Sequence, residues 1–321
     1  ICACLVGSEM CIRDRYTVDG LLKRWPDTKY RDWYLGDWLA PMGVDAGNQA
    51  SVDLVSNCFI SECLSTMYKT AITLGKREEA EEFAIRREKL NKLIHQTFYR
   101  ADEGIYSTGS QLDMCYPMLV GVVPDSLYNK VKENVVAMTE EKYKGHIAVG
   151  LVGVPILTEW AVRNKQVDFF YQMMKKRDYP GYLYMIDHGA TATWEYWSGE
   201  RSRVHNCYNG IGTWFYQAVG GIRLDEAKPG YRHFYVDPQI PNGVIWAKVT
   251  KESPYGTIAV NWKLKDDNQL NLQLTVPAGT TATVCIPNNA VSCKKNKKKV
   301  SVKEQTVDVE AGHYDFLFNL K

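Results

Sequence analysis

The hydrophobic pattern of the chain changes at Gly221, and this change limits the fold to two successive parts. Before it, apolar residues recur at intervals of three and four, which is typical of helices that pack on one face. After it, apolar and polar residues alternate in short runs between Pro, Gly, Asn and Asp residues, which is typical of strands. The pattern therefore predicts an α-helical part followed by a β-sheet part, in a chain of 321 residues that is long enough for two domains.

The helical part contains a predicted pair of helices of opposite character. Residues 53–74 are mostly apolar and stop before Gly75, a residue type that commonly follows a helix. Residues 76–99 are highly charged and keep only a narrow apolar face. This order is expected of an inner and an outer helix in a barrel of helical hairpins. Further helices are predicted at about 111–121, 125–141, 150–163, 165–177 and 205–220, and residues 16–25 resemble the end of a helix stopped by Pro26.

The β part is predicted to be a β-sandwich formed by residues 222–321. Its strands are indicated by the runs VIWAKVT, GTIAVNWKL, LNLQLTV, TATVCIP and YDFLFNL, and its six prolines would interrupt helices. The lysine run 294–299, broken only by Asn296, is expected to be a solvated hairpin or loop. We expect this part to pack on the helical part and to carry no catalytic residue.

An acid surrounded by aromatic residues marks the end of the helical part. Glu195 lies between Trp194 and Tyr196, with Trp197 and His205 close by in the sequence. Aromatic faces stack on the C–H faces of sugars, and a partly desolvated carboxylate can activate water or protonate a leaving oxygen. The alternative is that the aromatic residues are core residues and that Glu195 is a cap or a member of an ion pair. The residues alone leave both interpretations open.

The composition excludes several classes of function. The net charge of +2 is too close to neutral to indicate a nucleic-acid partner, and no apolar stretch approaches the roughly 20 residues of a membrane span. We expect no cofactor and no metal site, because the nine cysteines lack the paired spacing of zinc ligands. Their odd number argues against a complete disulfide framework, and Cys58 and Cys63 are expected to be buried thiols on a helix.

The segment GATATWEYWSG and the following SRVHNCYNGIGTWFYQAVGGI resemble the end of the catalytic domain of bacterial α-L-rhamnosidases, glycoside hydrolase family 78. The resemblance covers about residues 16–321. It implies a partial (α/α)6 toroid, the six-hairpin glycosidase fold, over residues 16–221, and a small C-terminal β-sandwich over residues 222–321. Residues 1–15 resemble a translated sequencing linker and are set aside as non-native. Since about seven or eight helices are predicted and a toroid has twelve, we expect a C-terminal fragment.

The resemblance also implies which residues contact the sugar. Asp37 and Trp38 match a Gly-Asp-Trp segment beside the sugar-binding cleft, although Asp37 is equally expected as a turn residue. Gln111 opens an inner helix that faces the cleft, with helix capping as the alternative role. His146 precedes a Gly-rich turn into another inner helix, with a structural role as the alternative. Trp194, Trp197 and His205 are expected to shape the site around Glu195.

Family members hydrolyse terminal α-L-rhamnose with inversion of configuration, and by position Glu195 matches the general base. Glu200 is a second candidate for the base, because the loop between Glu195 and His205 is shorter than in many members. The general acid of the family lies in a motif well upstream of the Gly-Asp-Trp segment, and that motif is absent from these 321 residues. We therefore expect the chain alone to be inactive as a normal glycosidase.

Three other functions are compatible with the same residues. The chain could belong to another inverting glycosidase on the same toroid, to a non-catalytic sugar-binding module, or to a purely structural helical scaffold. The expected partner is a rhamnose-containing glycoside or polysaccharide. The sequence leaves the rhamnoside, the oligomeric state and the location open, with a bacterial periplasm or the cell exterior as the favoured location.

Overall fold

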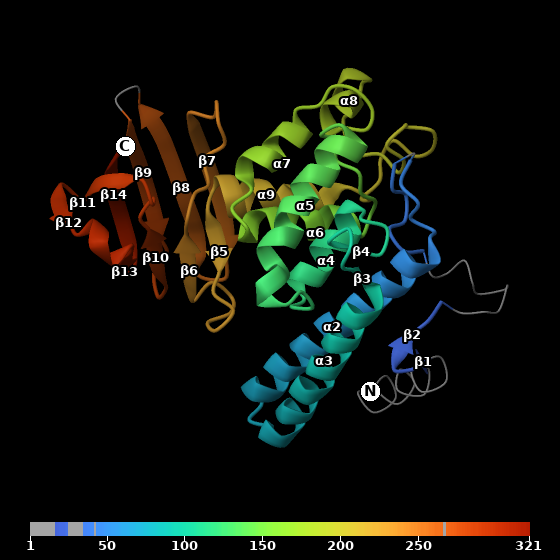
Figure 1. The fold of residues 1–321 in the computed structure, drawn as a ribbon. Coiled ribbons are helices and arrows are strands. Elements are labelled where there is room, and N and C mark those ends of the chain that lie inside the picture. The colour runs from blue at the N-terminus through green and yellow to red at the C-terminus, as the bar shows by residue number, and fades with distance from the viewer. Residues whose placement is uncertain (1–16, 25–34, 42, 266–267) are drawn as a thin grey trace. The chain divides into compact units, whose positions relative to one another are not determined.

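The computed structural model describes residues 17–24, 35–41, 43–265 and 268–321. The segment 1–15 that was set aside lies outside the described residues. The chain divides into two compact units, the first made of residues 1–160 and 172–210 and the second of residues 161–171 and 211–321. Helices dominate the first unit and two β-sheets dominate the second, as the hydrophobic pattern predicts (Figure 1).

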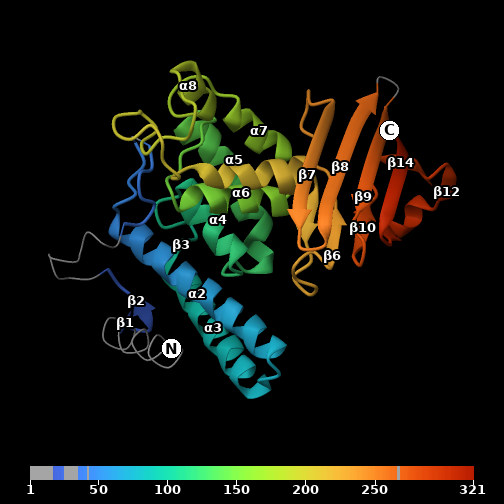
Figure 2. The same cartoon turned by 180° about the vertical axis from the view of Figure 1, so that it is seen from behind.

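The first unit contains the predicted pair of helices, α2 (Gln49–Thr73) and α3 (Arg77–Phe98). The two helices run side by side in both views (Figures 1 and 2). Helix α2 buries ten residues, whereas α3 buries only Ala80, Leu90, Ile94 and Phe98, which confirms the prediction of an inner and an outer helix. Gly75 lies just beyond α2 with a φ of +72°, a conformation that glycine adopts without a steric penalty.

The next hairpin repeats this division. Helix α4 (Gln111–Leu119) is buried along its length from Gln111 to Met118, while α5 (Asp125–Tyr143) buries only Val131, Val135 and Thr139. A short β-hairpin, β3 (Tyr99–Arg100) and β4 (Ile105–Tyr106), precedes α4. These helices agree with the predicted ranges. Helices α6 (Gly153–Arg163) and α7 (Val167–Met174) are shorter than their predicted ranges of 150–163 and 165–177.

Four sequence expectations are corrected by the structure. Residues 17–22 form a hairpin of β1 (Thr17–Val18) and β2 (Leu21–Leu22), not the end of a helix, because Asp19 and Gly20 both take positive φ, as a tight hairpin turn requires. Helix α8 (Tyr182–Asp187) was not predicted. The predicted helix 205–220 is a succession of η2 (Asn209–Ile211), α9 (Gly212–Trp214) and the π-helical η3 (Phe215–Val219), so it starts four residues late. Cys58 is buried as expected, but Cys63 is exposed.

The second unit contains two β-sheets. The four-stranded sheet has the order β13-β10-β6-β5, and the six-stranded sheet has the order β12-β11-β14-β9-β8-β7 (Figure 1). Neighbouring strands are antiparallel except β6 and β10, which are parallel. The strands are β5 (Ile222–Leu224), β6 (His233–Val236), β7 (Trp246–Ser253), β8 (Gly256–Lys265), β9 (Gln269–Val276), β10 (Thr281–Cys285), β11 (Ala290–Lys295), β12 (Lys298–Val300), β13 (Thr306–Val309) and β14 (Gly312–Leu320).

The core of this unit is formed by the alternate residues of each strand. In the six-stranded sheet Trp262, Leu272, Phe316 and Phe318 are almost completely buried. The indole Nε1 of Trp262 donates a hydrogen bond of 2.7 Å to the carbonyl oxygen of Val219. The lysine run forms the hairpin between β11 and β12, as predicted, so its charged side chains do not interrupt the core.

Candidate active site

Glu195 is a half-buried residue in a loop whose backbone is fixed by hydrogen bonds. The backbone N–H of Glu195 donates to the carbonyl oxygen of Ser202 at 2.8 Å, and the carbonyl oxygen of Glu195 accepts from the hydroxyl of Tyr208 at 3.2 Å. The carboxylate itself accepts one long hydrogen bond of 3.3 Å, from the backbone N–H of Ser202. The position of Glu195 is thus set by its backbone, and most of its capacity to accept protons or hydrogen bonds remains available.

Trp197 forms a buried support beneath this loop. Its ring stacks on that of Tyr208 with the centroids 4.1 Å apart, and the edge of Tyr182 packs against it at 5.2 Å. The indole Nε1 donates to the carbonyl oxygen of Val149 at 2.9 Å. Because Trp197 is only 1% exposed, it holds the loop in place and offers no open ring face to a ligand.

Trp194 is buried in the same way, on the other side of Glu195 in the sequence. It is 1% exposed, and the guanidinium of Arg203 lies 5.0 Å from the centre of its ring. Gly199 packs directly against the indole: a Cβ atom at Gly199 would lie 2.7 Å from the Cζ3 atom of Trp194. Gly199 also has a φ of +77°, so both its conformation and its surroundings require glycine.

Tyr208 joins the Glu195 loop to the segment that contains Trp38. Its single hydroxyl proton is shared between two carbonyl oxygens, that of Leu39 at 2.8 Å and that of Glu195 at 3.2 Å. Leu39 has a φ of +61°, which is uncommon for a residue with a side chain and places strain next to the candidate site. Tyr208 is not among the predicted site residues, because a tyrosine in an aromatic-rich segment is indistinguishable by sequence from a core residue.

Trp38 and His205 are the two predicted contact residues that remain partly accessible. Both are half-buried, and their rings meet edge to face with the centroids 6.2 Å apart. The Nδ1 atom of His205 accepts from the backbone N–H of Cys207 at 3.1 Å, so a neutral His205 carries its proton on Nε2. The structure therefore brings Trp38, His205 and the Glu195 loop together through contacts within the first unit.

Asp37 has a different environment from Glu195. It is 3% exposed, and its two oxygens accept from the backbone N–H groups of Gly150 and Gly153 at 2.8 and 2.7 Å. Burial raises the pKa of Asp37 from 3.8 to about 7, although these two hydrogen bonds act in the opposite direction. Gly153 is the first residue of α6, so Asp37 anchors the 35–41 segment to the start of that helix.

Gln111 is buried and serves as a link between backbone segments. Its side-chain oxygen accepts from the N–H of Ala148 at 2.7 Å, and its Nε2 donates to the carbonyl oxygen of His146 at 3.0 Å and to Thr139 at 2.9 Å. The capping role considered for Gln111 belongs to Ser110, whose hydroxyl accepts from the N–H of Asp113.

His146 is also buried and lies at the end of this link. Its Nδ1 lies 2.9 Å from the carbonyl oxygen of Pro180, and its Nε2 lies 3.2 Å from the carboxylate of Asp178. Both ring nitrogens of His146 therefore have partners in the protein. This geometry assigns the side chain a structural role, in which it joins the segment of Asp178 and Pro180 to that of His146.

Within the described residues, no three His, Cys, Asp or Glu side chains gather as metal ligands would. None of the helices in that part of the chain combines the length and the hydrophobicity that a membrane crossing requires.

Comparison with known proteins identifies relatives for both parts of the chain. Residues 10–219 match the model of the bacterial alpha-L-rhamnosidase 6 hairpin glycosidase domain, and residues 221–301 match that of the bacterial alpha-L-rhamnosidase C-terminal domain. An alpha-L-rhamnosidase of Formosa agariphila is 28% identical over 308 residues, and one of Alteromonas sp. is 26% identical over 300 residues. These alignments cover 87% and 88% of the chain and 32% of each relative, so the chain spans about a third of their length.

Solved structures have the same fold. The alpha-L-rhamnosidase of Streptomyces avermitilis, crystallised with L-rhamnose, has a TM-score of 0.84 at 22% identity, over 97% of this chain and 30% of that one. The enzyme from Dictyoglumus thermophilum has a TM-score of 0.80 at 21% identity, over 91% of this chain and 35% of that one. Because the six-hairpin model alone matches residues 10–219, more than half of the sequence, the chain belongs to the bacterial alpha-L-rhamnosidase six-hairpin glycosidase family.

Proposed function

We propose that this chain forms part of an enzyme that hydrolyses terminal α-L-rhamnose from glycosides or polysaccharides with inversion of configuration, and that Glu195 is its general base. The support for the substrate is the family, whose relatives are named alpha-L-rhamnosidases, and the similar fold of the Streptomyces protein crystallised with L-rhamnose. An inverting enzyme uses two carboxyl groups about 6.5 to 9.5 Å apart, with a water molecule on the side of the base.

The observation that carries the proposal is the contrast between two carboxylates of the predicted site, Asp37 and Glu195. Asp37 is buried, and both of its oxygens are occupied by backbone donors. Glu195 is half-buried and has a fixed backbone, and among the described residues its carboxylate accepts one long hydrogen bond. A general base must be reached by the water that it deprotonates, and the half-buried Glu195 meets this requirement whereas the buried Asp37 does not.

In the proposed reaction, a water molecule donates a proton to the carboxylate of Glu195 while its oxygen attacks C1 of the sugar. The bond from C1 to the leaving oxygen breaks, and that oxygen takes a proton from a second carboxylic acid, which we expect outside these 321 residues. Trp38 and His205 are the predicted residues with side-chain surface left for the sugar. Trp194 and Trp197 act by positioning the loop. Asp37 acts by anchoring the segment of Trp38, and Gln111 and His146 act by joining backbone segments of the first unit.

A substrate that needs no general acid tests this proposal on the chain itself. Dinitrophenyl α-L-rhamnoside is suitable, because its phenolate leaves without protonation and the reaction then depends on the base. We expect slow hydrolysis that gives β-L-rhamnose as the first product, followed by proton NMR, and a loss of about 10² to 10⁴ in rate for Glu195→Gln. Glu200→Gln is the matched control, because Glu200 is exposed in the same loop.

The outcomes separate the competing functions. Equal rates for Glu195→Gln and the unmodified chain, or α-L-rhamnose as the first product, would contradict the assignment of Glu195. A large loss in Glu200→Gln alone would assign the base to Glu200. Saturable binding of L-rhamnose that persists in Glu195→Gln, without turnover in either protein, would indicate a sugar-binding module.

A further inference from the structure

The six-stranded sheet has one buried face and one exposed face within the second unit. Side chains such as Trp262 and Phe316 belong to the buried face. The alternate residues, among them Trp246, Lys263 and Asp315, are exposed. The exposed face is therefore built mostly from polar and charged residues, with Trp246 and Leu317 among them, on strands that the core holds in a fixed register.

The strand register aligns the exposed and half-buried residues of this face into two rows that cross the sheet. In the first row, each residue is the direct cross-strand partner of the next: Trp246, Lys263, Asn271, Leu317, Lys294 and Lys299. The second row runs beside it through Lys248, Asn261, Gln273 and Asp315, and the backbone of Asp315 bonds to Asn296. Six strands at a spacing of about 4.8 Å make the first row about 24 Å long.

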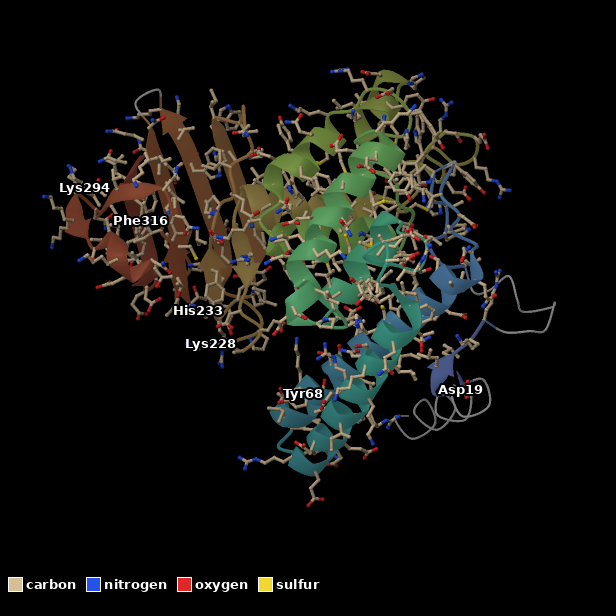
Figure 3. All side chains as sticks on the ribbon, in the orientation of Figure 1. Asp19, Tyr68, Lys228, His233, Lys294 and Phe316 are labelled. Carbon is tan, nitrogen blue, oxygen red and sulfur yellow. The ribbon has the colours of Figure 1, made fainter. Side chains whose placement is uncertain are left out.

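The middle of these rows forms an open hollow of about 710 Å³. Its lining includes Asn261, Asn271, Gln273 and Asn296, together with Lys263 and Lys294, which is labelled in Figure 3. Asn261 donates to the side-chain oxygen of Gln273 at 3.1 Å, which orients both amides. Side-chain amides carry donors and acceptors together, as hydroxyl-rich ligands require.

The charge of the two rows is positive. They contain the four lysines at positions 248, 263, 294 and 299 and the single acid Asp315, and Lys297 also lines the hollow. Among the residues that the structure describes, no carboxylate forms a salt bridge with any of these five lysines. Trp246, at one end of the first row, is 62% exposed.

We propose that this face of the six-stranded sheet binds a polysaccharide chain that carries uronic acid groups, with the chain lying across the strands. The lysines would pair with carboxylates, the amides would bond to sugar hydroxyls, and the exposed indole of Trp246 would stack on a sugar ring. The site belongs to the second unit, whereas Glu195 belongs to the first. The choice of a saccharide among anionic chains rests on the proposed function, whereas the charge and the register of the face do not.

The spacing of the charges favours a sparsely charged ligand. Lys263 and Lys294 are three strands apart, about 14 Å, with the amide of Asn271 and the apolar Leu317 between them. Duplex DNA carries one charge for about every 1.7 Å of its axis, far more than these lysines could match. Asp315 in the second row would also repel a dense run of phosphates or sulfates, but it can accept hydrogen bonds from hydroxyls.

Affinity electrophoresis and calorimetry of the full 321-residue chain with polygalacturonate test this proposal. We expect saturable binding that weakens when salt is raised from about 0.05 M to about 0.5 M, and we expect none to the fully methyl-esterified polymer, which is neutral. The double variant Lys263→Gln/Lys294→Gln should bind about tenfold more weakly, and Trp246→Ala should also bind more weakly. Lys228→Gln/Lys303→Gln is the control, because it removes the same charge at exposed lysines elsewhere in the unit (Lys228 in Figure 3).

The following outcomes would overturn the proposal. Absence of binding, equal binding of the neutral polymer, or equal losses in the two double variants would show that this face is not the site. Binding of dextran sulfate or single-stranded DNA, but not of polygalacturonate, would assign the face to a different anion. The same measurements on Glu195→Gln separate this inference from the proposed function, since polymer binding should persist there whether or not Glu195 is the base.

Discussion

Replacing Asp37 by Asn should change how the stability of the chain depends on pH. Burial raises the pKa of this carboxyl from 3.8 to about 7. Because the pKa in the folded chain is above that in the unfolded chain, the folded chain binds more protons between these two values. The free energy of unfolding should therefore fall as pH rises from about 4 to about 7, and Asp37→Asn should remove this part of the dependence.

The size of this pH effect on the free energy of unfolding follows from the two pKa values. One pKa unit corresponds to about 1.36 kcal/mol, and linkage between pH values of about 5 and 8 gives a relative loss of about 2 to 3 kcal/mol for the unmodified chain. The substitution also disturbs the hydrogen bonds from Gly150 and Gly153, at a cost of about 1 to 3 kcal/mol. That cost does not depend on the titration of Asp37, so the diagnostic quantity is the change with pH in the difference between the two proteins.

Urea denaturation followed by tryptophan fluorescence, repeated at pH values from about 5 to about 8, measures the difference in unfolding free energy between the two proteins. Asp102→Asn is the control, because Asp102 is exposed and its replacement should leave the pH dependence of the unmodified chain unchanged. A difference between the unmodified chain and Asp37→Asn that stays constant with pH would refute the reasoning. So would a difference that increases in favour of the unmodified chain at high pH.

Three further predictions concern the support of the site. Gly199→Ala should destabilise the chain by about 2 kcal/mol or more in thermal or urea unfolding, since a Cβ there meets an indole ring. Gly189→Ala is the control: Gly189 has a similar φ with open space around it, so its replacement should cost about 1 kcal/mol. Gln111→Leu should cost about 2 to 4 kcal/mol in the same assay, because it leaves buried backbone groups without partners; a cost under 0.5 kcal/mol, as is usual for surface positions, would contradict this. Tyr208→Phe should keep the fold, judged by circular dichroism, but lower the turnover of dinitrophenyl α-L-rhamnoside about tenfold, because the loop of Glu195 loses the hydroxyl that bonds to its backbone. Unchanged turnover would show that this hydrogen bond is not needed.

The helices were predictable where periodicity and end signals agreed. The three-and-four spacing of residues 53–74, closed by Gly75, gave α2, and the charge of residues 76–99 gave its outer partner α3. The β1–β2 hairpin was not predicted, although the sequence contains the turn dipeptide Asp19-Gly20 that is typical of such hairpins. Two adjacent positive φ values outweigh a short helix-like pattern, because such a turn reverses the chain within two residues.

The residue types of the site were predictable, but their exposure was not. The pattern placed aromatic residues around Glu195, and the fold does gather Trp38 and His205 with that loop. Sequence spacing cannot tell a ring that faces a ligand from one that is stacked on a neighbour, and Trp197 is of the second kind. The bonds of Asp37 join residues more than 100 positions apart, a separation at which local pattern carries no information.

Azide rescue of Glu195→Ala tests the central assignment, that Glu195 is the general base. Azide is already an anion, so it can attack C1 of dinitrophenyl α-L-rhamnoside without losing a proton to a base. We predict that the variant loses turnover, that azide restores it, and that NMR identifies the product as β-L-rhamnosyl azide. Unimpaired turnover without azide would contradict the assignment, and an α-linked azide would contradict the single inverting displacement on which it depends.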